Sequence, residues 1–168
     1  MEYQQFRAVL FDWGNTLMQD DPSQPAAMAV WPQVHRIAGA DALLGGLHQR
    51  GLKLALATGA LVSDEAEIRA ALARVQLDQY LDKIYCHSNS GLRKPSTEFY
   101  QHILDDLRIL PAQALMVGDS YASDVLAPNQ LGIPAIWYNP HGSEVKYGPL
   151  CSTVHSLVDL LARFEQAN

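Results

Sequence analysis

Cysteine and clustered positive charge are both scarce in this sequence. The chain has 168 residues, and its two cysteines are Cys86 and Cys151. Cys86 ends a strand-like run, Lys83–Cys86, which favours a reduced core thiol over a disulfide. No basic cluster exceeds the pair Arg93-Lys94, and the net charge is −6. A nucleic-acid-binding surface is therefore excluded from the expected functions.

Long apolar segments are also missing. No stretch approaches the roughly 18 apolar residues that span a bilayer. The first residues, Met1–Gln5, carry neither the basic segment nor the apolar core of a secretory signal. We therefore expect a cytoplasmic protein without membrane contact. Hydrophobic residues make up 48% and charged residues 18% of the chain, so residues 1–168 are expected to form a single globular domain.

The chain does contain a series of short apolar runs that alternate with helical patterns. Such alternation is typical of βαβ units, and runs that are apolar throughout are typical of strands buried on both faces. The sequence thus predicts an α/β fold with a parallel sheet of about five strands flanked by helices. The predicted strands are Phe6–Asp12, Leu52–Thr58, Lys83–His87, Ala114–Gly118 and Pro134–Tyr138.

Helix start signals lie between these strands. Ser63 is predicted to cap the helix that runs to about Val75, and Ser96 or Thr97 is predicted to cap the next one. Residues 17–39 are rich in proline and fit neither pattern. We expect them to form a loop and one short helix above the carboxyl edge of the sheet.

Polar side chains follow the predicted strands. Asp12 and Thr58 end the first two strands, and Asp119 comes directly after Ala114–Gly118. An open parallel sheet places its chemistry at the carboxyl ends of its strands. These side chains are therefore expected to lie close together.

The residue types suit phosphoryl transfer. A carboxylate can attack phosphorus only when cations hold the phosphoryl oxygens, because two anions otherwise repel. Asp12 is the candidate nucleophile, while Asp119 and Asp124 offer the hard oxygen ligands that Mg²⁺ prefers. Lys94 offers a second positive charge, and Thr58 offers a neutral hydroxyl donor. Each residue alone has an ordinary structural explanation, but their order on successive strand ends indicates a shared site.

Four segments of the chain resemble, in order, the four motifs of the haloacid dehalogenase superfamily. They are Phe11–Leu17, Thr58, Arg93–Pro95 and Gly118–Asp124. The resemblance extends from Phe6 to about Tyr138. It implies a three-layer, Rossmann-like fold with the first strand in the centre of the sheet.

The resemblance also implies roles for individual residues. Asp12 would be the nucleophile that forms an aspartyl-phosphate. Mg²⁺ would be bound by Asp12, Asp119 and the backbone carbonyl of Gly14. Asp124 would hold either the water shell of the metal or Lys94.

Gly14 is the main departure from the superfamily pattern. Phosphatases of the superfamily have an aspartate there, which protonates the leaving group and then activates water. Positioned acid/base groups contribute roughly 10²–10⁴-fold to a rate, so we expect a slow Mg²⁺-dependent phosphate monoester hydrolase. Asp20 and Asp21 lie one loop away and are alternatives for the missing carboxylate, although Asp-Asp-Pro more often only turns the chain.

Two other functions stay open. A non-catalytic or regulatory module would keep the phosphate-binding pocket without turnover. Haloacid dehalogenation is the weaker choice, because dehalogenases of the superfamily use no metal and lack the arrangement of Asp119 and Asp124. Schiff-base chemistry would need a lysine from the segment that covers the site. It is not favoured, since the one lysine between Leu17 and Thr58 is Lys53, at the start of the second predicted strand.

The segment that could cover the site is short. About forty residues separate the first two predicted strands, so residues 17–39 are expected to be a cap remnant within one domain. The substrate is expected to be phosphorylated, and a second copy of the chain or another partner is a candidate to cover the open site. Met28, Val30 and Trp31 are interpreted as core residues, with an exposed contact patch as the alternative.

Overall fold

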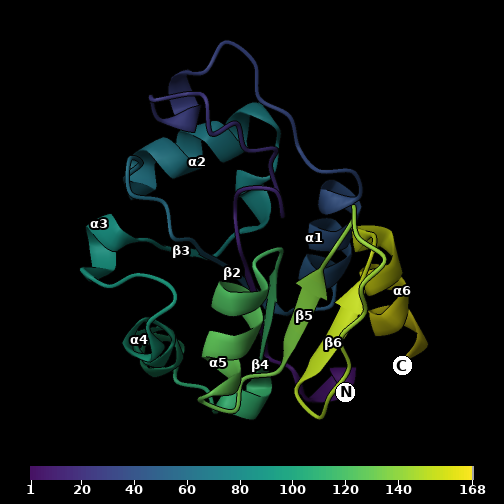
Figure 1. Ribbon diagram of the computed structural model, residues 1–168. Coiled ribbons are helices and arrows are strands. Elements are labelled where there is room, and N and C mark those ends of the chain that lie inside the picture. The colour runs from purple at the N-terminus through teal and green to yellow at the C-terminus, as the bar shows by residue number, and fades with distance from the viewer. Residues whose placement is uncertain (168) are drawn as a thin grey trace.

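The fold is built on one parallel sheet (Figure 1). The structure is a computed structural model that describes residues 1–167, and within this range the sheet has six strands in the order β3-β2-β1-β4-β5-β6. All neighbouring strands run parallel, which confirms the predicted α/β fold. The strands are β1 (Ala8–Phe11), β2 (Lys53–Ala57), β3 (Lys83–Tyr85), β4 (Ala114–Gly118), β5 (Ala135–Tyr138) and β6 (Cys151–Val154).

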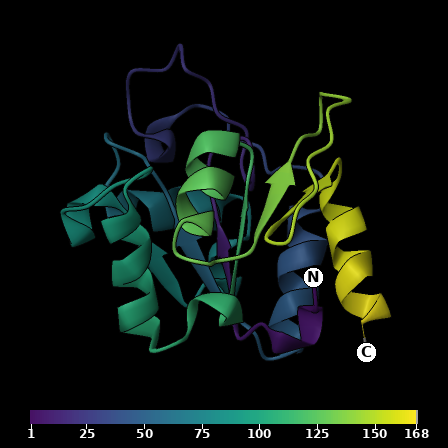
Figure 2. The same ribbon diagram turned by 60° about the horizontal axis from the view of Figure 1, so that its bottom comes forward.

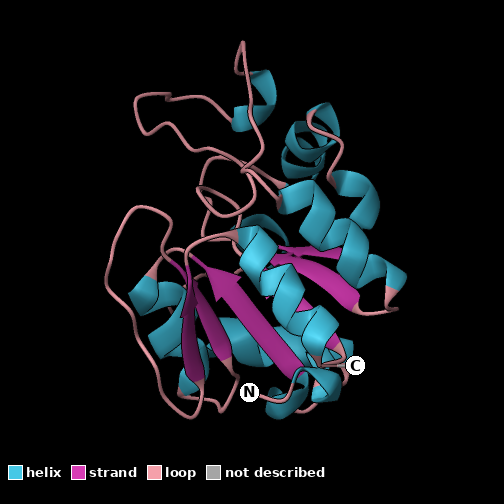
Figure 3. Ribbon diagram, turned by 90° about the vertical axis from the view of Figure 1, so that its right-hand side faces the viewer, coloured by secondary structure: helices cyan, strands magenta, loops and turns pink. Residues whose placement is uncertain are grey.

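Helices cover both faces of the sheet, so the fold has three layers (Figures 1 and 3). One face packs against α1, α2 and α6, and the other packs against α4 and the segment around α5. The α-helices are α1 (Ala40–Gln49), α2 (Glu65–Arg74), α3 (His87–Ser90), α4 (Thr97–Leu107), α5 (Ala127–Asn129) and α6 (Leu157–Gln166). Shorter turns are η1 (Tyr3–Gln5), η2 (Met28–Val30), η3 (Asp78–Tyr80), η4 (Pro111–Gln113) and the π-helical η5 (Tyr121–Leu126). No helix within residues 1–167 is both long and apolar enough to cross a membrane.

β1 lies inside the sheet because its side chains are apolar on both faces. Val9 packs in the core on one side, Leu10 packs in the core on the other, and both are fully buried. Phe11 pairs in register with Leu56 of β2 and Val117 of β4. The three strands therefore end at one edge, and the residues that follow them emerge side by side.

β6 corrects the predicted number of about five strands. Its sequence, Cys-Ser-Thr-Val, contains two hydroxyl residues and so does not read as an apolar run. Arg163 of α6 donates hydrogen bonds to the Ser152 hydroxyl (2.6 Å) and to the Thr153 carbonyl oxygen (2.8 Å). The Thr153 hydroxyl donates to the carbonyl of Lys146. These bonds satisfy the polar groups, which allows this strand to be buried at the edge of the sheet.

The helix starts agree with the predicted positions in one case and differ in the other. Ser96 caps α4, with its hydroxyl accepting from the Phe99 N–H at 3.2 Å. The cap of α2 is Asp64 and not Ser63. Its carboxylate accepts from the Glu67 N–H, and the Glu67 carboxylate accepts from the Asp64 N–H. This reciprocal pair satisfies two backbone donors, which Ser63 could not do because no Glu or Gln lies three residues after it.

Residues 17–39 form a loop and the short turn η2 above the carboxyl edge of the sheet (Figure 2). Arg74 of α2 holds this segment by donating to the carbonyl oxygen of Trp31 at 2.7 Å. Met28 and Trp31 are buried, whereas Val30 is exposed. The interpretation as core residues is confirmed for Met28 and Trp31 and wrong for Val30.

Candidate active site

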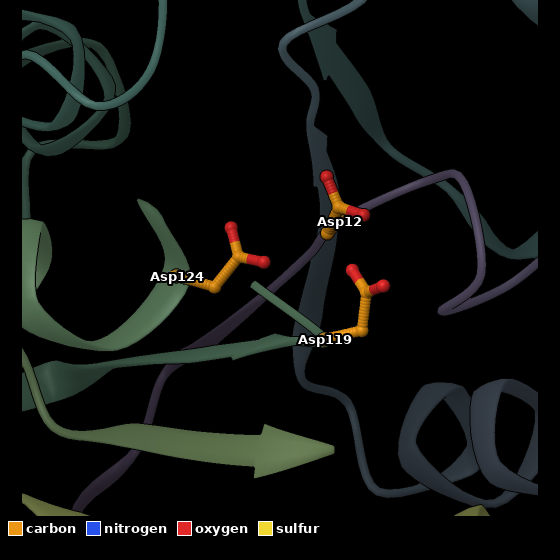
Figure 4. A group of neighbouring side chains, drawn as sticks. All are labelled: Asp12, Asp119 and Asp124. Carbon is orange, nitrogen blue, oxygen red and sulfur yellow. The ribbon is translucent and has the colours of Figure 1, made fainter. Parts of the chain in front are cut away.

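Three carboxylates meet at the carboxyl edge of the sheet (Figure 4). Asp12 follows β1, Asp119 follows β4, and Asp124 lies in η5. One carboxylate oxygen from each residue lies within 4.8 Å of the other two. β1 and β4 end side by side, which places Asp12 next to Asp119. The chain then turns after β4, and this turn places Asp124 beside them. The predicted convergence of these residues is therefore present in the fold.

Lys94 joins two of these carboxylates. Its ammonium donates to Asp12 Oδ1 at 2.5 Å and to Asp124 Oδ1 at 2.7 Å. The Lys94 side chain is 5% exposed. Burial opposes its positive charge, but Asp12 and Asp124 outweigh that effect and raise the pKa of Lys94. The lysine therefore stays charged and holds the two acids in place.

Asp124 is fully buried and depends on a close backbone approach. Its Oδ2 accepts from the Ser120 N–H at 3.0 Å. A β-carbon at Gly118 would lie 2.2 Å from the same oxygen, so position 118 has room for glycine alone. Burial raises the pKa of Asp124, while Lys94 opposes the rise. These contacts orient the carboxylate toward Lys94 and the sheet edge.

Asp119 forms no ion pair with a basic side chain among residues 1–167. Burial, and next the charge of Asp12, raise its pKa to about 6. With all groups ionised, the three acids and Lys94 sum to a charge of −2. Hard carboxylate oxygens gathered around a net negative charge are the donor set that Mg²⁺ binds. The residues present therefore fit this metal.

Two hydroxyl groups lie beside Asp12 or in the same cavity. Thr58 follows β2, is buried, and accepts a hydrogen bond from the Ala60 N–H at 3.1 Å. Thr16 is fully buried and donates to Asp12 Oδ2 at 3.4 Å. The sequence reasoning missed Thr16, although it lies within the first motif-like segment. A hydroxyl four residues after the candidate nucleophile was the available signal.

Asp20 reaches the site, whereas Asp21 does not. Asp20 lines the same cavity as Asp12 and Gly14. The Asp21 carboxylate accepts from both the backbone N–H and the hydroxyl of Ser23. This local turn lowers the pKa of Asp21 and keeps its carboxylate outside the cavity. The two neighbouring acids are therefore distinguished by the path of the loop.

The cavity itself has a volume of about 560 Å³. Its lining includes the carboxylate cluster, Lys94 and Thr58. Apolar side chains in the lining include Trp31, Leu61 and Val62. Among the described residues that line it, Lys94 is the single cationic side chain.

A family model with the description "Haloacid dehalogenase-like hydrolase" matches residues 24–138. The chain belongs to this family. The matched segment includes Thr58, Lys94 and Asp119 and begins after Asp12 and Gly14. Membership therefore does not depend on the segment in which this chain departs from the superfamily pattern.

Two curated relatives of this chain are named as a nucleotidase and a phosphatase. The pyrimidine 5′-nucleotidase PynA of Streptococcus pneumoniae is 31% identical over 113 residues, which are 67% of this chain and 46% of the relative. The phosphoglycolate phosphatase of Rhodospirillum rubrum is 33% identical over 115 residues, which are 68% of this chain and 44% of the relative. The matched part of the chain thus spans about half the length of each relative.

A solved structure extends the similarity over nearly the whole chain. An uncharacterized protein from Listeria monocytogenes serotype 4b is 26% identical, with a TM-score of 0.82. The alignment covers 96% of this chain and 98% of that protein. The fold of this chain therefore has a counterpart of nearly the same length.

Proposed function

We propose that this protein is a Mg²⁺-dependent phosphate monoester hydrolase that works through an aspartyl-phosphate on Asp12. The observation that carries the proposal is the contact of one buried ammonium, Lys94, with both Asp12 and Asp124 in the lining of a cavity. A cation beside the nucleophile offsets the repulsion between a carboxylate and a phosphate.

The side chains of the candidate site have the following roles in the proposed reaction. An oxygen of Asp12 bonds to phosphorus as the bond to the ester oxygen breaks, and a water molecule later releases phosphate. Lys94 and Thr58 donate hydrogen bonds to the phosphoryl oxygens, and Thr16 orients Asp12. Asp12, Asp119 and the carbonyl of Gly14 would hold Mg²⁺, with Asp124 behind them. The bound metal would supply charge that stabilises the transferred group.

The cavity wall indicates the kind of leaving group. Trp31, Leu61 and Val62 present apolar surface, and the described lining offers no second cation for another phosphate or carboxylate. The proposed substrate is therefore a monophosphate with an uncharged leaving group. The printed names of the relatives from Streptococcus and Rhodospirillum support phosphate-ester hydrolysis as the reaction class.

A phosphate-binding module without turnover is the second candidate. Gly14 favours it, because the usual acid/base side chain is missing at this position. Dehalogenation has less support, because the carboxylate cluster is suited to a cation that this reaction does not use.

Hydrolysis of p-nitrophenyl phosphate with and without Mg²⁺ tests the proposal. We expect Mg²⁺-dependent turnover in the wild type and at least a ~10³-fold loss in Asp12→Asn, since the nucleophile is removed. Asp21→Asn is the matched control, because that carboxylate lies outside the cavity. Activity that is equal in wild type and Asp12→Asn would contradict the proposal, and phosphate binding without turnover would favour the second candidate.

The single-domain organisation, the cytoplasmic location and a covering partner stay predictions. Leu61 and Val62 are 63% and 65% exposed and line the cavity. A second copy or another partner that covers the site would contact these residues. Light scattering of the purified chain, with and without Mg²⁺ and phosphate, measures whether a second copy does so.

A further inference from the structure

The carboxyl group of Asp20 lies directly beside the position that a side chain of residue 14 would take. A β-carbon built on Gly14 would lie 3.2 Å from Asp20 Cβ and 3.4 Å from both Asp20 Cγ and Oδ2. These are the three nearest atoms to that position. An aspartate at position 14 and the aspartate at position 20 would therefore compete for the same space.

We infer that Asp20 is a further catalytic residue, the proton donor and acceptor that Gly14 cannot be. This inference rests on the proposed hydrolase function. It also accounts for the glycine, since a β-carbon at position 14 would be in tight contact with Asp20 and the carboxyl would have to shift.

Hydrogen bonds to two other parts of the chain hold the loop that carries Asp20. The Asp20 N–H donates to Asn15 Oδ1 at 3.1 Å, and the Asn15 N–H donates to the Met18 carbonyl at 2.6 Å. Asn15 has a φ of 56°, a left-handed conformation that asparagine tolerates better than most residues. The Gln19 N–H donates to the carbonyl of His35 at 2.9 Å. The chain is thus returned to the site six residues after Gly14.

Asp20 is open both to water and to the cavity that holds Asp12. Its charge is also among the causes that raise the pKa of Asp119, so the two acids are close enough to interact. Asp21 does not line this cavity, and its carboxylate closes a turn with Ser23.

The proton balance is complete with this residue. Protonated Asp20 gives its proton to the ester oxygen as the phosphorus–oxygen bond breaks and the bond to Asp12 forms. The resulting carboxylate then takes a proton from the water molecule that attacks phosphorus. The bond between phosphorus and Asp12 breaks, inorganic phosphate leaves, and Asp20 is protonated again.

The test compares two substrates that differ in how much they need an acid. Phenyl phosphate has a poor leaving group, and p-nitrophenyl phosphate has a good one. We expect Asp20→Asn to lower kcat/KM for phenyl phosphate by about 10²-fold or more, and for p-nitrophenyl phosphate by less than about tenfold. A purely structural role would lower both values alike. Asp21→Asn is the matched control and should leave both unchanged.

Two further measurements make the assignment sharper. Calorimetric titration of Mg²⁺ should give Asp20→Asn an affinity within about threefold of the wild type, since Asp20 is not among the assigned ligands. Adding Gly14→Asp to Asp20→Ala should restore at least about tenfold of the lost phenyl phosphate activity. Thermal unfolding shows that each variant is folded.

The outcomes separate this inference from the proposed function. If Asp20→Asn hydrolyses phenyl phosphate as fast as the wild type while Asp12→Asn does not, Asp20 is not the acid/base and the hydrolase function stands. If the wild type hydrolyses neither substrate, or Asp12→Asn remains fully active, both are overturned.

Discussion

The two sides of the cavity differ in how far their charged and polar side chains are buried. On the sheet side, Lys94 and Asp124 are 5% and 0% exposed, and their charges offset each other in a buried network. On the loop side, Asn15 and Asp20 are exposed and joined by one hydrogen bond. A buried charge that loses its partner is costly, whereas a hydrated one is not. Substitutions on the sheet side should therefore affect stability and chemistry together, and those on the loop side chemistry alone.

The largest effect is expected for Lys94→Ala. It leaves Asp12 and the buried Asp124 without their shared cation. We expect the free energy of unfolding in EDTA to fall by about 3 kcal/mol, together with loss of hydrolysis. Lys53→Ala is the matched control, because Lys53 and Asp82 form an exposed pair at 3.7 Å and should contribute less than about 1 kcal/mol. Equal losses in the two variants, measured by urea unfolding, would refute the contrast between buried and exposed pairs.

A smaller effect is expected for Asp119→Asn. The folded-state pKa of Asp119 is raised to about 6, above the ordinary value of 3.8. The folded state therefore binds more protons than the unfolded state between these values, and the group destabilises the metal-free protein as the pH rises through this window. At pH 7 in EDTA, Asp119→Asn should be more stable than wild type by about 1 kcal/mol after allowance for solvent screening.

The same pKa shift makes two further measurements informative. The stability difference between Asp119→Asn and wild type should vanish near pH 4, and the Mg²⁺ affinity of the wild type should fall as the pH drops below 6. Thermal unfolding in EDTA and calorimetric Mg²⁺ titration measure these quantities. A wild type that is more stable than Asp119→Asn at pH 7 without metal would contradict the electrostatic account.

The smallest effect on stability is expected on the loop side, for Asn15→Gly. Glycine adopts the φ of 56° without strain, so the free energy of unfolding should change by no more than about 0.5 kcal/mol. The acceptor for the Asp20 N–H is lost, and hydrolysis of phenyl phosphate should fall by about tenfold or less because the carboxyl is less well placed. Unchanged hydrolysis would show that this hydrogen bond does not position Asp20.

The sheet side of the molecule could be predicted from the sequence because its signals are local. Apolar runs predicted the positions of five strands, and parallel pairing then requires the residues after them to share one edge. Asp12, Thr58 and Asp119 were assigned to that edge for this reason. β6 was missed because the polar groups of Ser152 and Thr153 are satisfied by Arg163, which lies eleven and ten residues further along the chain.

The loop side required the folded chain. Asp20 and Asp21 are adjacent and identical in type, so the residue type alone does not say which of them faces the site. The hydrogen bond from the Asp20 N–H to Asn15 turns one carboxyl toward Gly14, and the turn with Ser23 holds the other outside. The positions of the residues that follow buried strands can be predicted, because the hydrophobic pattern of the sequence marks the strands and parallel pairing aligns their ends. The carboxyl beside Gly14 follows from a loop whose path is set by contacts between residues distant in sequence, such as Gln19 with His35.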